Sequence, residues 1–244
     1  MESKIHIKWH DELDSTNDEL LRHIHDYDNL SVIAAVNQTA GRGQRGNRWL
    51  SEPGDNLTFS LLVKPEGFPV REFMAFTFLA TLVIRDFLQE EGVPAIIKWP
   101  NDIYVGTKKI CGMLIENTLE EDRIAASVIG IGLNLNQTAF PGELVNPTSL
   151  KRLTGKTYDP HEVLEQICAR FEERLPLLEN SRTTLYHAYG KDLFQAGIPC
   201  RYRDLASGEE FTGTIKGVTR EGRLQLERDG EIRSYAFKEV GYIL

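Results

Sequence analysis

A chain of 244 residues with 41% hydrophobic side chains can bury one large domain, or a medium domain and a small one. Its formal net charge of −8 at pH 7 argues against a general nucleic-acid binder. No apolar run approaches the ~18 residues of a membrane span, and the N-terminus lacks the apolar core of a signal peptide. Three cysteines without metal-ligand spacing indicate reduced thiols in a cytoplasmic protein.

Two overlapping helix-start signals stand between Asp14 and Leu20. Ser15 and Thr16 are candidate N-caps, because each is followed three residues later by an acid and then by an apolar helical pattern. These hydroxyls and the Asn17 amide either form a capping box alone or also line a polar pocket. Both can hold, since a helix N-terminus offers free N–H groups to a ligand.

A buried strand is predicted at residues 31–36, and a loop of unusual composition follows it at residues 41–49. The loop holds three glycines, three arginines and Trp49. Glycine lets a backbone approach a ligand closely, and arginine presents a fork of donors to carboxylate or phosphate. The loop is either a mobile surface segment or the wrapping of a compact anion. Its place at a strand end favours binding.

The middle of the chain predicts a strand, a helix and a hairpin. Residues 57–63 form the strand, and residues 70–89 form a helix that is buried on most faces. Residues 96–105 and 109–116 are two β-rich runs around a turn at Gly106, which predicts the hairpin.

Four polar residues are unexpected in this apolar hairpin: Lys98, Asn101, Asp102 and Lys109. In one interpretation they form a salt-bridged sheet edge. In the other, Lys109 faces an anion, and Asp102 with Asn101 faces a metal or a hydroxyl.

A further strand is predicted from Ile124 to Asn136, and it contains Gly130 and Gly132. These glycines are not a dinucleotide fingerprint, because a third glycine is missing and no helix follows. We expect them to let a ligand lie against the strand. Asn134 and Asn136 offer amide groups to the edge of a base.

The last third of the chain changes from helices to short strands. Residues 161–175 predict an amphipathic helix that Pro176 ends or kinks, and residues 183–189 predict a shorter helix that ends at Gly190. Short β-rich runs separated by turn signals such as Asp229-Gly230 then predict a small antiparallel barrel or sheet.

We therefore expect two domains, residues 1–190 and residues 191–244.

Together these motifs resemble those of the biotin–protein ligases. The matching segments are Ser15-Thr16-Asn17, Gln38, Gly41 to Gly46 with Trp49, Lys98 to Asp102, Lys109 to Gly112, and Gly130 to Asn134. They stand in the family's order, and the β-rich C-terminus fits as well, so the resemblance covers essentially the whole chain. It implies an α+β fold, with a central mixed sheet flanked by helices as in class II aminoacyl-tRNA synthetases. It also implies a small C-terminal SH3-like β-barrel.

The resemblance implies an activity. Such enzymes use MgATP to convert biotin to biotinyl-5′-AMP, and then transfer biotin to a lysine of a carrier such as the biotin carboxyl carrier domain of acetyl-CoA carboxylase. Biotin and ATP are then substrates, and Mg²⁺ is the cofactor. In the first step a carboxylate attacks a phosphate, so fixed cations and N–H donors must offset the repulsion between two anions.

The resemblance also assigns roles to the matching residues. The biotin contacts it implies are Ser15, Thr16, Asn17, Gln38, Arg42, Gly43, Gln44 and Lys109. Arg42 and Lys109 also meet the phosphate, and Asp102 is the candidate for meeting Mg²⁺ or orienting the acceptor lysine. The remaining ligand-binding positions are Gly41, Arg45, Trp49, Gly112, Gly130, Gly132 and Asn134, with Trp49 and Asn134 on the nucleotide side. No general base for the acceptor lysine is evident.

Two positions depart from the family's common pattern. Gln44 stands where arginine is frequent, which predicts weaker retention of the adenylate, and Cys111 stands where a small apolar residue is usual. Because the Ser15 motif begins so early, we expect a ligase-only form without the DNA-binding domain of repressor relatives, as a monomer or a homodimer. The alternatives are a lipoate or octanoate ligase of the same superfamily and a non-catalytic biotin sensor.

Overall fold

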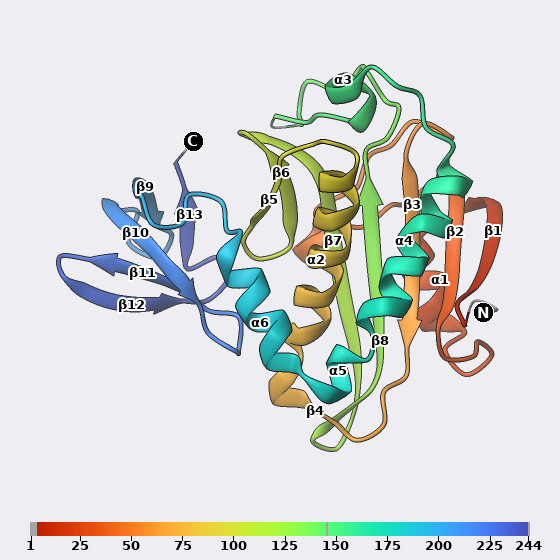
Figure 1. Cartoon of the computed structure of the whole chain (residues 1–244), viewed down its shortest axis with the longest axis horizontal. Helices are drawn as coiled ribbons and strands as arrows, with labels where there is room; N and C mark the ends of the chain where they lie inside the picture. Colours follow the sequence, from red (N-terminus) through yellow and green to blue (C-terminus); the bar gives the residue numbers. More distant parts are fainter. Residues whose placement is uncertain (1–3, 145, 244) are drawn as a thin grey trace.

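The computed structural model describes residues 4–144 and 146–243 (Figure 1). The larger of its two sheets has the strand order β1-β2-β3-β8-β7-β6-β5, and the short β4 pairs with β8. Its strands are β1 (His6–Leu13), β2 (Ser31–Gln38), β3 (Leu57–Val63), β4 (Phe68–Pro69), β5 (Ala95–Lys98), β6 (Asp102–Val105), β7 (Lys108–Glu120) and β8 (Arg123–Leu133). Only β1 and β2 pair in parallel among these strands, so the sheet is mixed.

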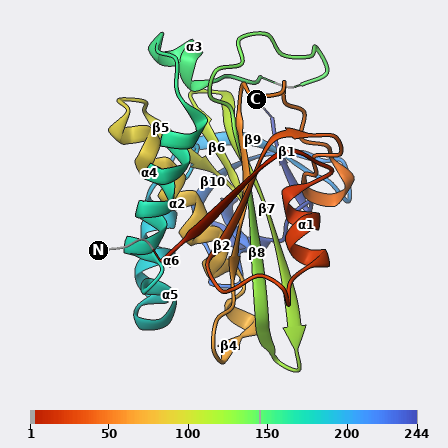
Figure 2. The same ribbon diagram turned by 90° about the vertical axis from the view of Figure 1, so that its right-hand side faces the viewer.

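Helices cover both faces of this sheet, as Figure 2 shows. The single helix α1 lies on one face, and α2, α4, α5 and α6 lie on the other. The helices are α1 (Thr16–Arg22), α2 (Met74–Glu90), α3 (Leu150–Thr154), α4 (Pro160–Arg174), α5 (Leu177–Asn180) and α6 (Arg182–Lys191), with 3₁₀ turns η1 (Gln44–Gly46) and η2 (Val70–Glu72). None of the described helices is long and apolar enough to cross a membrane.

The core lies between the sheet and α2. All seven residues of β3 are buried, and α2 buries residues around nearly its whole circumference because it lies between the sheet and α4 and α6. This confirms the predicted buried strand at residues 57–63 and the predicted buried helix. The amphipathic helix α4 likewise ends at Arg174, just before Pro176.

The smaller sheet is antiparallel and has the order β12-β11-β10-β9-β13. Its strands are β9 (Pro199–Asp204), β10 (Glu210–Val218), β11 (Leu224–Arg228), β12 (Glu231–Tyr235) and β13 (Val240–Tyr242). The predicted Asp-Gly hairpin joins β11 and β12, and both Asp229 and Gly230 have positive φ, as a tight turn between twisted strands requires.

Two local predictions are wrong. Residues 96–105 are not one strand, because β5 and β6 are separated by a turn at Trp99–Asn101 with a cis peptide bond before Pro100. Proline has no N–H to donate to a ladder, so the strand cannot continue through it. The shorter helix was expected to end at Gly190, but α6 includes Gly190 and runs to Lys191.

The turn between β5 and β6 is also where the two sheets meet. The Trp99 Nε1 group donates to the Gly222 carbonyl oxygen at 2.8 Å, and the Trp99 ring packs edge-on against Phe237. Ile97 exchanges backbone hydrogen bonds with the connection to β9, donating to Asp192 at 2.8 Å and accepting from Phe194 at 2.7 Å. These contacts hold β13 beside the end of β5.

We predict that Gly222→Ala destabilises the protein more than Gly230→Ala. Both glycines have φ near +80°, so alanine at either costs about 1–2 kcal/mol of backbone strain. A Cβ at Gly222 would also lie 2.6 Å from Met74 Cγ, whereas a Cβ at Gly230 would meet open space. Overpacking against Met74 adds about 1–3 kcal/mol. Urea unfolding measures both values, and equal losses would contradict the packing argument.

Candidate active site

A cavity of about 340 Å³ opens where the larger sheet meets the smaller one. Its walls come from the start of α1, the end of β2, the glycine loop (residues 41–49), the β5–β6 turn, β7, β8 and the strand β13. Most of the predicted site residues line it: Ser15, Thr16, Asn17, Gln38, Arg42, Gly43, Gln44, Trp49, Asp102, Lys109, Gly112, Gly130 and Gly132. Six separate segments of sequence are therefore brought to one hollow.

The start of α1 forms a buried polar wall. Ser15 caps the helix by accepting from the Asp18 N–H at 3.4 Å, which confirms the predicted N-cap. A capping box also has a second hydrogen bond, from the N-cap backbone N–H to the side chain three residues later. That bond is absent from the described contacts, because the Ser15 N–H donates to Asp14 Oδ1 instead, at 2.7 Å. The Thr16 N–H donates to Gln38 Oε1 at 2.8 Å, which ties the helix start to the end of β2.

Asn17 lies at the centre of a hydrogen-bond chain that crosses this wall. Its Oδ1 accepts from Ser60 at 2.5 Å, and Ser60 is 2.7 Å from Thr16 Oγ1. Its Nδ2 donates to the Leu114 carbonyl at 3.2 Å and to Glu116 Oε2 at 2.9 Å. A Cβ at Gly130 would lie 2.1 Å from Asn17 Oδ1, so this glycine makes room for the Asn17 side chain.

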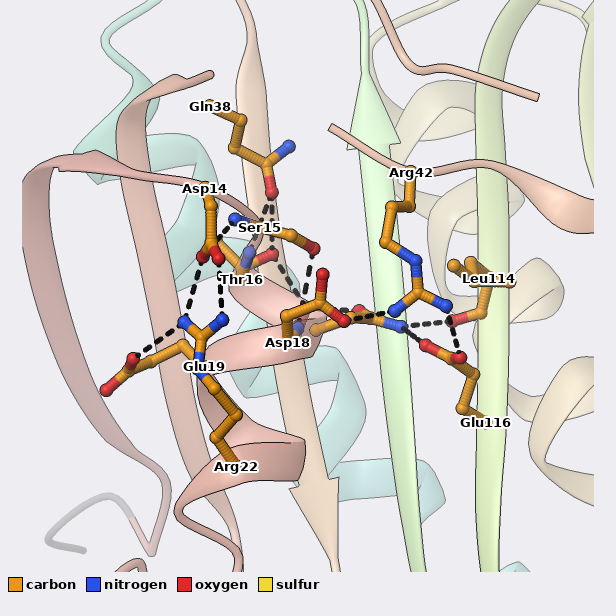
Figure 3. A network of polar contacts seen from close by, with 12 residues as sticks. Asp14, Ser15, Thr16, Asp18, Glu19, Arg22, Gln38, Arg42, Leu114 and Glu116 are labelled. Carbon is orange, nitrogen blue, oxygen red and sulfur yellow. Dashed lines mark hydrogen bonds and ion pairs between the residues drawn. The ribbon is translucent and has the colours of Figure 1, made fainter. Parts of the chain in front are cut away.

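The glycine loop folds back on itself as a narrow turn over the cavity. The Trp49 N–H donates to the Gly41 carbonyl at 3.0 Å, and the Gly43 N–H donates to the Asn47 carbonyl at 2.7 Å. Arg42 reaches from the loop to two carboxylates, Glu116 at 2.6 Å and Asp18 (Figure 3). The side chain of Arg45 lies outside the described part of the structure.

Trp49 covers two glycines on neighbouring strands. A Cβ at Gly132 would lie 2.3 Å from Trp49 Cε2, and a Cβ at Gly112 would lie 3.2 Å from the same indole. The indole Nε1 is buried and has no hydrogen-bond partner among the described residues, and the same holds for Gln44 Oε1. A buried polar atom without a partner is costly, so both atoms lack a bond that burial ordinarily requires.

The polar residues of the predicted hairpin form an ion pair that faces the cavity. Lys109 Nζ lies 2.7 Å from Asp102 Oδ1, and each side chain is only about one-quarter to one-third exposed (32% and 25%). The pair is thus a salt bridge, as in the first interpretation, and the second interpretation stays a prediction for residues that line the hollow. Asn101 also lines the hollow, and its buried amide donates to the Met113 carbonyl on β7.

Lys98 lies beside this pair, between the two sheets. Its Nζ is 3.2 Å from the Tyr104 hydroxyl and 5.1 Å from the ring of Tyr242 on β13. Burial lowers the pKa of Lys98 from its ordinary value; Lys109 adds to this effect, and Asp102 opposes it. The Tyr242 hydroxyl is buried without a partner in the described structure.

Two predicted residues are not on the cavity wall. Gly41, the first residue of the glycine loop, packs against the last one, because a Cβ at Gly41 would lie 2.6 Å from the Trp49 carbonyl oxygen. Asn134 is buried, and its Nδ2 donates to the Thr148 carbonyl at 2.9 Å, so its amide joins the segment before α3 to β8. Its predicted contact with the nucleotide has no geometric support here.

Sequence reasoning missed several residues of the cavity wall and one residue behind it. Glu116 bonds the wall residues Arg42 and Asn17, and the sequence could have indicated it, because it follows Gly112 and Leu114 at the two-residue spacing of one strand face. Lys238 and Tyr242 carried no signal, since only the packing of the smaller sheet brings them to the cavity.

The donor set limits what metal this site could hold. No group of three histidine, cysteine, aspartate or glutamate side chains gathers among the described residues. Asp102 is the carboxylate on the cavity wall, and one carboxylate suits Mg²⁺ when phosphate and water oxygens complete its shell. The site thus fits an ion that arrives with a phosphate ligand.

Comparisons with known proteins agree with this geometry. Residues 9–134 match the biotin/lipoate A/B protein ligase family, and residues 197–237 match the biotin protein ligase C-terminal domain. The bifunctional ligase/repressor BirA of Bacillus subtilis is 32% identical over 242 residues, which cover 93% of this chain and 71% of that protein. A biotin–[acetyl-CoA-carboxylase] ligase of Paracoccus denitrificans is 32% identical over 65% of this chain and 68% of its own.

Solved structures show the same relationship. The biotin protein ligase of Aquifex aeolicus in complex with biotin and ATP has a TM-score of 0.81 and 28% identity, over 97% of each chain. The mixed sheet flanked by helices and the C-terminal antiparallel sheet are thus an architecture found in biotin protein ligases.

We predict that Gly132→Ala displaces the Trp49 ring, because the added methyl would occupy its place. Acrylamide quenching of tryptophan fluorescence should therefore increase. The measurement is made in a Trp9→Phe background, in which Trp49 and the buried Trp99 are the two remaining indoles. Gly142→Ala is the control, since a Cβ there meets open space. Unchanged quenching in Gly132→Ala would contradict the close packing of Trp49.

Proposed function

Because this chain belongs to the biotin/lipoate A/B protein ligase family, we propose that it activates biotin with ATP and joins it to a protein lysine. The observation that carries the proposal is a cavity lined by two chemically different kinds of group. Neutral hydrogen-bonding groups form one wall, and two cations, Arg42 and Lys109, also line the cavity. A ligand with an uncharged polar ring and a carboxylate, such as biotin, matches both kinds of group.

The neutral wall suits the ureido ring of biotin. That ring has one acceptor oxygen and two N–H donors, so it needs both kinds of partner. Ser15, Thr16 and Gln38 supply hydroxyl and amide groups there, and all three line the cavity. Asn17 supports this wall, because its amide is already bonded to Ser60, Leu114 and Glu116.

The two cations suit the first chemical step. A biotin carboxylate oxygen forms a bond to the α-phosphorus of ATP, and the bond from that phosphorus to the bridging oxygen breaks as pyrophosphate leaves. Lys109 and Arg42 offset the repulsion between the two anions and stabilise charge on the transferring phosphate. Mg²⁺ bound with ATP supplies further neutralisation of phosphate charge, with Asp102 as the protein carboxylate at hand.

The nucleotide lies on the side of Trp49 in this proposal. The Trp49 indole offers a face for stacking and an unpartnered Nε1, with Gly112 and Gly132 beneath it. The family resemblance assigns further ligand-binding positions: Gly41, Gly43, Gln44, Arg45, Gly130 and Asn134. Of these, Gly41 and Asn134 lie off the cavity wall, so their assignment rests on the resemblance alone.

In the second step the amine of an acceptor lysine attacks the acyl carbon. The bond from that carbon to the AMP oxygen breaks, and the amine loses a proton. Asp102, 2.7 Å from Lys109, is the carboxylate proposed to orient this amine. The acceptor proposed is the biotin carboxyl carrier domain of acetyl-CoA carboxylase or a related carboxylase.

We propose further that the larger sheet is a catalytic core of the class II aminoacyl-tRNA synthetase type and that the smaller sheet is an SH3-like barrel. The domain boundary is proposed near residue 190, at the end of α6, and the C-terminal family match that starts at residue 197 supports it.

The test is exchange of pyrophosphate into ATP in the presence of biotin, lipoate or octanoate. We expect exchange with biotin alone, because the reversible first step needs the acid that fits the cavity. Exchange with lipoate instead would move the protein to another branch of the family. Biotin binding without any exchange would indicate a sensor.

Lys109→Met should lower the rate of this exchange about 10²–10³-fold, the usual cost of removing one charge-stabilising donor. Lys108→Met is the matched control, because its neighbouring side chain is exposed and does not line the cavity. Equal rates for the two variants would remove Lys109 from the reaction.

Gln44→Arg should slow release of biotinyl-5′-AMP by about tenfold, the effect of roughly 1.4 kcal/mol from a new charged contact to phosphate. The physical reason is that Gln44 lines the cavity with an unpartnered oxygen, where a guanidinium would reach the anion. Release is measured by trapping the free adenylate, and an unchanged rate would refute the prediction.

A further inference from the structure

Glu116 on β7 joins the glycine loop to the polar wall of the cavity (Figure 3). Its Oε1 accepts from Arg42 at 2.6 Å, and its Oε2 accepts from Asn17 Nδ2 at 2.9 Å. Its side chain is 25% exposed, so both bonds form partly shielded from water. Asp18 is the other carboxylate on Arg42, and its side chain makes no described bond to Asn17.

The bonds to Glu116 and to the Leu114 carbonyl together fix which way the Asn17 amide points. A carboxylate only accepts hydrogen bonds, so the Asn17 nitrogen must face it and the Asn17 oxygen must face Ser60. The Ser60 hydroxyl then donates to Asn17 at 2.5 Å, and its oxygen accepts from Thr16 at 2.7 Å.

Thr16 is the last group in this order of donors, at the start of α1. The Gln38 amide is oriented separately, by the Thr16 backbone N–H that donates to Gln38 Oε1 at 2.8 Å. Glu116 and the Leu114 carbonyl thus determine the polarity of a chain of groups that reaches from the glycine loop to Thr16.

We propose that Glu116 is a positioning residue for biotin. Glu116 couples the position of the glycine loop to the orientation of the hydrogen-bonding groups that receive the ureido ring. When Arg42 sits on Glu116, the carboxylate is held where it also bonds Asn17. The polar wall and the loop therefore reach their binding arrangement together. This inference rests on the proposed function of the chain.

The first test compares Glu116→Gln with Asp18→Asn in the full chain. Both neighbours of Glu116 are donors, and a glutamine presents one oxygen and one NH₂ group, so it satisfies Arg42 or Asn17 but not both. We expect Glu116→Gln to weaken biotin binding by about tenfold or more in calorimetry, and Asp18→Asn by less than about threefold. Equal losses for the two variants would overturn the proposal, because Arg42 would then account for the whole effect.

The second test uses Ser60, which is linked to Glu116 only through Asn17 in the described contacts. Ser60→Ala should itself weaken biotin binding, since the Asn17 amide loses the donor that opposes Glu116. In the Ser60→Ala background, Glu116→Gln should then add less than about threefold, because the chain is already broken. Additive losses would show that the two residues act separately, and a merely structural role for Glu116 predicts that additivity.

Wild-type protein separates this inference from the proposed function. If wild type neither binds biotin nor supports exchange, the proposed function fails and the inference falls with it. If wild type is active and Glu116→Gln binds biotin normally, only the role of Glu116 is refuted. Ser60→Ala, with Glu116 intact, decides the question by itself if the glutamine variant does not fold.

Discussion

The site depends on holding two cations beside one cavity before any anionic ligand arrives. A partly buried charge without a partner is costly, so each cation needs a resident carboxylate. Lys109 has Asp102, and Arg42 has Asp18 and Glu116. The larger sheet supplies this arrangement, because β6 and β7 set the first pair side by side and β7 also carries Glu116 toward α1.

Small residues make a second contribution to the same arrangement. Gly130 and Gly132 on β8 leave the space that Asn17 and Trp49 occupy. Extended backbone without a side chain thus lets a helix start and a loop approach the sheet from the same face. The polar wall and the indole could not lie so close to the strands if either position carried a Cβ.

Sequence patterns predicted the elements whose signal is local. The buried strand β3, the buried helix α2 and the cap at Ser15 follow from periodicity and side-chain chemistry within a few residues. The family motifs then predicted most of the residues that line the cavity. What local patterns could not reveal were pairings across the chain, such as Arg42 with Glu116 and Lys98 with Tyr242. Asn134 shows the converse, because a motif position that looks exposed in the sequence is buried by a segment that follows it.

The contact between Trp99 and Gly222 spans 123 positions, and β13 forms part of the cavity wall. On a ribosome, the residues of the larger sheet emerge long before this wall exists. A nascent chain can therefore build its ion pairs and polar wall early, but its cavity stays open on one side until residue 242 has left the exit tunnel. Ligand protection of the growing polypeptide would appear late and abruptly, as a property of the finished interface between the sheets.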